Sequence, residues 1–121
     1  MTKKVLIVDD SPTQLNHLRK MVEQAGHGAL LAESGEKALI IATEERPDVI
    51  LMDIVMPGMN GYSAARMLHR DETTRDIPLI FVTQKDGVAD RDWGLRQGAC
   101  EYLTKPVDPA ELLSAIEAAT S

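Results

Sequence analysis

Short apolar runs alternate with apolar positions at helical spacing along the whole chain, and this alternation predicts an α/β fold. Runs rich in Val, Ile and Leu predict five strands, at residues 5–9, 29–32, 49–53, 79–83 and 101–103. Apolar residues three and four positions apart predict five helices, at residues 12–25, 36–45, 61–70, 88–97 and 108–119. Ser11-Pro12 and Asp108-Pro109 each join a capping side chain to a proline, which is typical of a helix start.

The predicted strands lack the alternating polar residues of a sheet that has one face in water, so both faces should be covered by helices. Strand-helix-strand units of this kind form parallel sheets with right-handed crossovers. We therefore expect a doubly wound, five-stranded parallel sheet of strand order 2-1-3-4-5. In that order, ligands bind beyond the carboxyl ends of strands one and three.

Composition limits the range of functions. The 121 residues suffice for one domain, residues 1–121, and the net charge of −6 with scattered Lys and Arg argues against nucleic-acid binding. Cys100 is the only cysteine, so no internal disulfide is expected, and we predict a buried, inert thiol. The sequence shows no signal peptide and no apolar run of about 18 residues, which favours a cytoplasmic protein without membrane insertion. We assign no role to the three histidines, which share no ligand spacing.

Three carboxylates should meet at the predicted binding edge. Asp9 and Asp10 end the first strand, and Asp53 ends the third. Ionised carboxylates this close repel one another, so shared protons or a hard divalent cation must offset their charge. We favour Mg²⁺, with Mn²⁺ as a substitute. The alternative is that the acids are separate helix caps and solvated loop residues. This interpretation explains Asp10 better than Asp9.

Two further polar residues follow neighbouring strands. Thr83 ends the fourth strand and Lys105 comes just after the fifth, so a hydroxyl and an ammonium should lie at the same edge as the acids. Each alone is a common strand or surface residue. With the acids they complete a site for phosphoryl chemistry, with a nucleophile, metal ligands, a hydroxyl donor and a cation.

These motifs together resemble the receiver domain of bacterial two-component response regulators, the CheY-like family with a flavodoxin-like fold. The resemblance covers the whole chain and rests on Asp9-Asp10, Asp53 with the following MPGMNG, Thr83, and the stretch YLTKP around Lys105. The stretches DDSPT, DIVMPGMNG and WGLRQGACEYLTKPV are most similar to the PilH-type regulators of twitching motility, which belong to a chemotaxis-like system controlling type IV pili.

The resemblance implies that Asp53 is the phosphoacceptor, which attacks the phosphohistidine of a sensor histidine kinase of CheA type. It implies that Mg²⁺ is held by Asp10, Asp53 and the backbone carbonyl of Val55, with Asp9 acting through water. Lys105 would pair with one phosphoryl oxygen. The Lys105-Pro106 bond is expected to be cis.

The resemblance also implies a switch. Thr83 would donate its hydroxyl to the phosphoryl group, and Tyr102 would turn inward in the active state. A downstream protein would bind the face formed by residues 88–97, 101–103 and 108–119. With no output domain expected, the chain would act as a monomer through protein binding, or as a phosphate sink in this or another pathway. It would be a signalling protein that catalyses only its own phosphoryl transfer and dephosphorylation.

Three other functions remain open from the residues alone. A flavodoxin-like electron carrier shares the topology, but Asp9 and Asp10 would repel an FMN phosphate. A haloacid-dehalogenase-like phosphatase requires an acid two positions after the nucleophile, where this chain has Val55. A scaffold with a receiver-like fold needs none of the site residues. Near the start of the helix at residues 88–97, Asp86, Asp90 and Asp92 suit the helix dipole. Exposure or burial of Trp93 on this helix stays equally open.

Overall fold

The computed structural model describes residues 2–121, in which strands and helices alternate as the sequence predicts. The strands are β1 (Lys4–Val8), β2 (Gly28–Ala32), β3 (Val49–Met52), β4 (Leu79–Thr83) and β5 (Glu101–Thr104). The helices are α1 (Pro12–Gln24), α2 (Gly35–Glu45), α3 (Gly61–Arg70), α4 (Val88–Arg96) and α5 (Pro109–Thr120). Every predicted element is confirmed, and the observed ends differ from the predicted ones by at most one residue.

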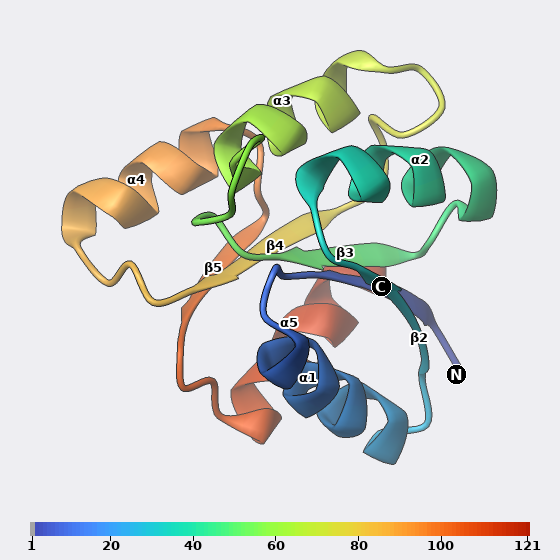
Figure 1. Cartoon of the computed structure of the whole chain (residues 1–121). Coiled ribbons are helices and arrows are strands. Elements are labelled where there is room, and N and C mark those ends of the chain that lie inside the picture. The colour runs from blue at the N-terminus through green and yellow to red at the C-terminus, as the bar shows by residue number, and fades with distance from the viewer. Residues whose placement is uncertain (1) are drawn as a thin grey trace.

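The strands form one parallel sheet in the order β2-β1-β3-β4-β5, which confirms the predicted topology. Helices α1 and α5 cover one face of the sheet, and α2, α3 and α4 cover the other (Figure 1). Each face has its own apolar cluster: Leu6, Ile50 and Phe81 face α2–α4, whereas Ile7, Leu51 and Ile80 face α1 and α5. Because both faces are covered, the central strands are apolar at nearly every position.

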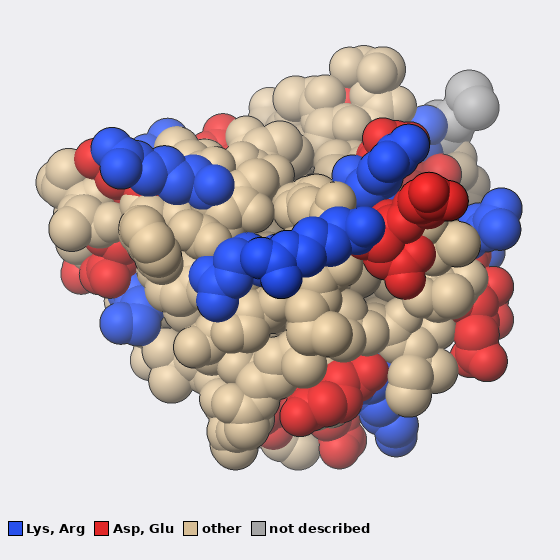
Figure 2. All heavy atoms as spheres, turned by 90° about the horizontal axis from the view of Figure 1, so that it is seen from above, with Lys and Arg blue, Asp and Glu red and all other residues tan. Residues whose placement is uncertain are grey.

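Charged side chains are dispersed over the face that carries α2, α3 and α4. Figure 2 shows Lys and Arg there in several groups, of which those in the middle lie end to end with acidic side chains beside them. This face thus carries charges of both signs. Within residues 2–121, every helix is too short or too polar to cross a bilayer.

Side-chain caps hold the starts of four helices. Ser11, Ser34, Asn60 and Asp108 each accept a backbone N–H from the first turn of the helix that follows. Ser11 and Asp108 confirm the two starts predicted from their serine-proline and aspartate-proline pairs. Helix α4 differs, because its N-cap is Gly87, which offers no side-chain hydrogen bond.

The prediction of a buried Cys100 is wrong, because the side chain is exposed. The Cys100 N–H donates to the Leu79 carbonyl where β5 begins to pair, and Ala99 takes the buried position just before it. The Cys100 side chain then lies on the outer side, in a small hollow with Ala115 and Ala118 of α5. Desolvation by these neighbours raises the pKa of the thiol, which keeps it protonated at neutral pH.

A close approach of two backbone segments shapes the loop after β3. The Gly61 N–H donates to the Ile54 carbonyl over 2.9 Å and begins α3 against the backbone of Asp53. A Cβ on Gly61 would lie 2.8 Å from the Ile54 Cα and closer still to the Asp53 carbonyl oxygen. Only glycine lets the loop close this tightly, so Gly61 fixes the backbone that carries Asp53.

We predict that Gly61→Ala lowers the free energy of unfolding by about 1–3 kcal/mol, because the new methyl group meets backbone that cannot move aside. Urea denaturation followed by circular dichroism measures the change. Gly28→Ala is the matched control, because a Cβ there lies 3.9 Å from its nearest neighbour, and its effect should stay within about 0.5 kcal/mol. Equal stabilities of the two variants would contradict the close approach.

Candidate functional site

Three acidic residues meet beyond the carboxyl ends of β1 and β3. Val8 lies opposite Met52 in the paired strands, so Asp9 and Asp53, one residue further on, are neighbours. One carboxylate oxygen from each of Asp9, Asp10 and Asp53 lies within 4.8 Å of the others. Asp9 and Asp53 are buried, at 1% and 9% exposure, whereas Asp10 is exposed. The predicted convergence of these acids is therefore confirmed.

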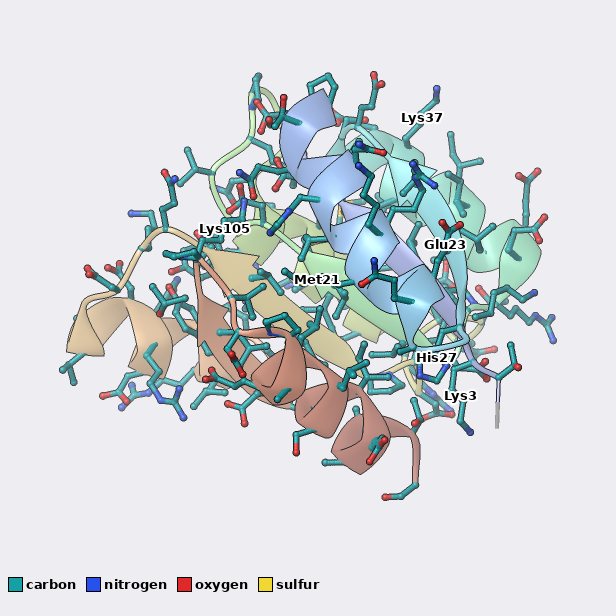
Figure 3. The ribbon with its side chains drawn as sticks, turned by 90° about the horizontal axis from the view of Figure 1, so that it is seen from below. Lys3, Met21, Glu23, His27, Lys37 and Lys105 are labelled. Atoms are coloured by element: carbon teal, nitrogen blue, oxygen red, sulfur yellow. The ribbon has the colours of Figure 1, made fainter. Side chains whose placement is uncertain are left out.

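The Lys105 ammonium pairs with both buried acids. Its Nζ lies 2.6 Å from the Asp9 Oδ2 and 3.2 Å from the Asp53 Oδ2, and the lysine side chain is only 8% exposed. In Figure 3 Lys105 lies at the opposite end of the sheet from Lys3 and His27, where the strands end and the loops begin. This pairing offsets part of the repulsion that led us to expect a cation at the site. The sequence showed Lys105 at this edge but not its contact with Asp9.

Backbone groups orient each of these side chains. The Ser11 N–H donates to Asp9 Oδ1 over 2.9 Å, and the Ile54 N–H donates to Asp53 Oδ1 over 2.7 Å. The Lys105 N–H donates to the Thr83 carbonyl over 2.8 Å, which extends the pairing of β5 with β4 up to the lysine. The Lys105-Pro106 bond is cis, as expected.

The site opens to solvent through a pocket of about 450 Å³. Its lining includes all three acids, Lys105, Val55 and the fully buried Thr83, so every residue predicted for the phosphoryl and metal sites borders it. It also includes Ser11, which the sequence predicted as a helix cap, together with Lys85, Gln14 and Gln84. The arrangement offers a carboxylate nucleophile, oxygen donors for a hard cation, and an ammonium beside them.

Tyr102 points inward from β5. Its side chain is 3% exposed, and its hydroxyl donates to the Lys85 carbonyl over 2.7 Å. Gly94 of α4 makes room for the ring, because a Cβ at Gly94 would lie 2.8 Å and 2.9 Å from two ring carbons of Tyr102. Trp93, beside Gly94, is 49% exposed and packs edge-on against Tyr62.

Side chains cover the outer edge of β5 at Tyr102. Strand β5 is the last of the sheet, so the backbone groups of Tyr102 that face away from β4 have no strand to pair with. Instead the Tyr102 N–H donates to the Glu101 carboxylate over 2.9 Å, and its carbonyl accepts from the Arg91 guanidinium over 3.1 Å. Arg91 and Glu101 are themselves 3.5 Å apart, and we call these two residues the edge clamp.

Comparison with known proteins agrees with this geometry. The family profile of the response regulator receiver domain matches residues 5–117. The chain is 54% identical over 115 residues to protein PilH of Pseudomonas aeruginosa, and the match covers 95% of each chain. Several other curated relatives are longer proteins, of which the chain spans about a quarter to a half. The polar-differentiation response regulator DivK of Brucella ovis, at 37% identity, is matched over 95% of its length.

Solved structures with the same architecture include chemotaxis protein CheY4 of Vibrio cholerae, with a TM-score of 0.91 and 28% identity over 98% of this chain and 99% of that one. Another is the receiver domain of the sensor histidine kinase PA1611 from Pseudomonas aeruginosa, with a TM-score of 0.89 and 32% identity over 98% and 97% of the two chains. That structure has a magnesium ion coordinated in its active-site cleft.

Burial raises the pKa of Tyr102 to about 12, and the nearby Tyr62 and Asp90 add to the effect. Because the pKa in the folded protein is above the ordinary value of 10.0, the neutral phenol stabilises the fold fully below pH 10, and this contribution is lost between about pH 10 and pH 12. We predict that ultraviolet titration shows one tyrosine ionising near pH 12, and that this transition disappears in Tyr102→Phe.

Gly94→Ala should displace the Tyr102 ring and bring its pKa back toward 10. Tyr62→Phe is the control, because it leaves the burial of Tyr102, the largest cause, in place and should lower that pKa only in part. Circular dichroism at each pH verifies that the fold is intact. Ionisation of both tyrosines near pH 10 in the folded native chain would contradict the inward placement.

Proposed function

The chain belongs to the response regulator receiver domain family, and we propose that it accepts a phosphoryl group on Asp53 from the phosphohistidine of a sensor histidine kinase. The observation that carries this proposal is the position of the Asp53 carboxylate. It borders an open pocket, 3.2 Å from the Lys105 ammonium and next to two further acids. The 54% identity to PilH supports the same family role.

The residues have distinct roles in the transfer. An oxygen of Asp53 attacks phosphorus, a new P–O bond forms, and the P–N bond to the kinase histidine breaks with its electron pair returning to the imidazole. Lys105 offsets the negative charge of the phosphoryl oxygens. Thr83 accepts the Lys85 N–H over 3.4 Å through its hydroxyl oxygen, so the hydroxyl proton is left to donate to the phosphoryl group.

The donor set fits a magnesium ion. We propose that Asp10, Asp53 and the backbone carbonyl of Val55 hold Mg²⁺, or Mn²⁺ in its place, since hard cations prefer oxygen ligands of this kind. Asp9 fits an indirect role through water, because its side chain is only 2% exposed, against 12% for Asp53, and it holds the Lys105 ammonium more closely, at 2.6 Å against 3.2 Å. When bound, the ion supplies positive charge that neutralises the transferring phosphoryl oxygens.

We further propose that the chain acts as a monomeric receiver in the cytoplasm. A CheA-type kinase would phosphorylate it, Thr83 and Tyr102 would report the change, and a partner protein would bind the face formed by α4, β5 and α5. Control of type IV pilus twitching motility follows from the resemblance to PilH-type regulators. The alternative is that the chain acts as a phosphate sink, which competes for phosphoryl groups by the same transfer to Asp53.

We predict that Asp53→Asn abolishes phosphorylation by acetyl phosphate or by the cognate kinase, because the amide is not a nucleophile at this position. Intact mass spectrometry measures the added phosphoryl group, and circular dichroism verifies the fold. The control is Asp76→Asn, which removes an exposed acid just before β4, at the opposite end of the sheet, and should be labelled like the native chain. Full labelling of the folded Asp53→Asn variant would refute the assignment.

We predict that Asp10→Asn weakens Mg²⁺ binding by about tenfold or more, because Asp10 is the exposed carboxylate that is free to meet the ion directly. Isothermal titration calorimetry of the unphosphorylated chain measures the affinity. Asp76→Asn removes the same charge far from the site and should bind Mg²⁺ like the native chain. An Asp10→Asn variant with native affinity would exclude Asp10 as a ligand.

A further inference from the structure

Lys85 contacts three parts of the molecule that the proposed function treats separately. Its N–H donates to the Thr83 hydroxyl oxygen over 3.4 Å, and its carbonyl accepts from the Tyr102 hydroxyl over 2.7 Å. Its side-chain Nζ lies 3.8 Å from the Asp90 Oδ1 in the first turn of α4. One residue thus connects the phosphoryl site, the inward tyrosine and the start of α4.

The Lys85 ammonium has two possible anionic partners. Lys85 lines the same pocket as Asp53, although its ammonium is paired with Asp90. Both side chains of that pair are about 40% exposed, and exposed ion pairs contribute little to stability. Phosphorylation replaces the single charge of the Asp53 carboxylate with a phosphoryl group of about −1.5 to −2, which is larger than the single charge of Asp90.

Helix α4 is poorly anchored at the end where Asp90 lies. Its N-cap, Gly87, provides no side-chain bond, and Gly94 is the one residue of this helix that is buried. The Asp90 carbonyl accepts a long bond of 3.5 Å from the Tyr62 hydroxyl. The Lys85–Asp90 pair, although weak, is therefore one of the few contacts that join the first turn of α4 to the rest of the structure.

We propose that Lys85 is a mobile counter-ion that links phosphorylation to α4. Its ammonium pairs with Asp90 in the unphosphorylated chain and moves to the phosphoryl oxygens when Asp53 is phosphorylated, which releases the first turn of α4. The inference rests on the proposed phosphoacceptor role of Asp53. The two contacts of Lys85 compete, so removing Asp90 should tighten the binding of a phosphoryl group. This gain should disappear when Lys85 is also removed.

The test is a double-mutant cycle with beryllofluoride and Mg²⁺, a non-covalent mimic of the phosphoryl group on a carboxylate, measured by calorimetry. Asp90→Asn should tighten beryllofluoride binding about two- to fivefold, the range that an exposed ion pair supports, and Lys85→Gln should weaken it. In the Lys85→Gln background, Asp90→Asn should change the affinity no more than Asp86→Asn does. Asp86 is the matched control, because it is a neighbouring acid on the loop after β4 and shows no ion pair among the described residues.

Hydrogen exchange of residues 88–93 gives a second readout. Beryllofluoride should accelerate exchange there in the native chain. The Asp90→Asn variant should exchange faster than the native chain even without beryllofluoride. If Asp90→Asn changed the beryllofluoride affinity equally in the native and the Lys85→Gln backgrounds, only the removed charge would matter. That result would overturn the inference while leaving the role of Asp53 intact. A folded native chain that binds no beryllofluoride would overturn both.

Discussion

The ion pairs of Lys105 with Asp9 and Asp53 join three parts of the chain that are distant in sequence. The lysine follows β5, and the acids follow β1 and β3, so one ammonium holds together the ends of three strands. With both acids buried, loss of the ammonium would leave uncompensated charge in a region of low polarity, which typically costs several kcal/mol. The site is thus held in place by the same charges that make it reactive.

The two faces of the sheet contribute differently to this site. Helices α1 and α5 are anchored by side-chain caps at Ser11 and Asp108, and their inward residues form a cluster with the central strands. On the other face, α4 has a glycine cap and a single buried residue, yet it lies against Tyr102. A receiver needs a rigid frame for the carboxylates and a part of the structure that yields, and α4 is the part with the weakest attachment.

The sequence predicted the fold well because a doubly covered sheet leaves a strong pattern of apolar strands and capped helices. It also predicted the convergence of Asp9 and Asp53, since parallel strands end at a common edge. It could not predict that Lys105 contacts Asp9, because that contact depends on side-chain geometry across three loops. The inward position of Tyr102 depends on Gly94, which carries no recognisable motif, and Cys100 was misplaced because composition does not indicate which of two adjacent small residues faces inward.

The edge clamp determines what a partner would encounter on β5. An uncovered edge strand offers a row of N–H and C=O groups to which another strand can add with little regard for its side chains. At Tyr102 both groups are already bonded to Glu101 and Arg91 of the same chain. A protein that docks beside β5 therefore meets a guanidinium and a carboxylate rather than bare backbone, and recognition at this edge depends on matching side chains, which favours a selective partner over aggregation.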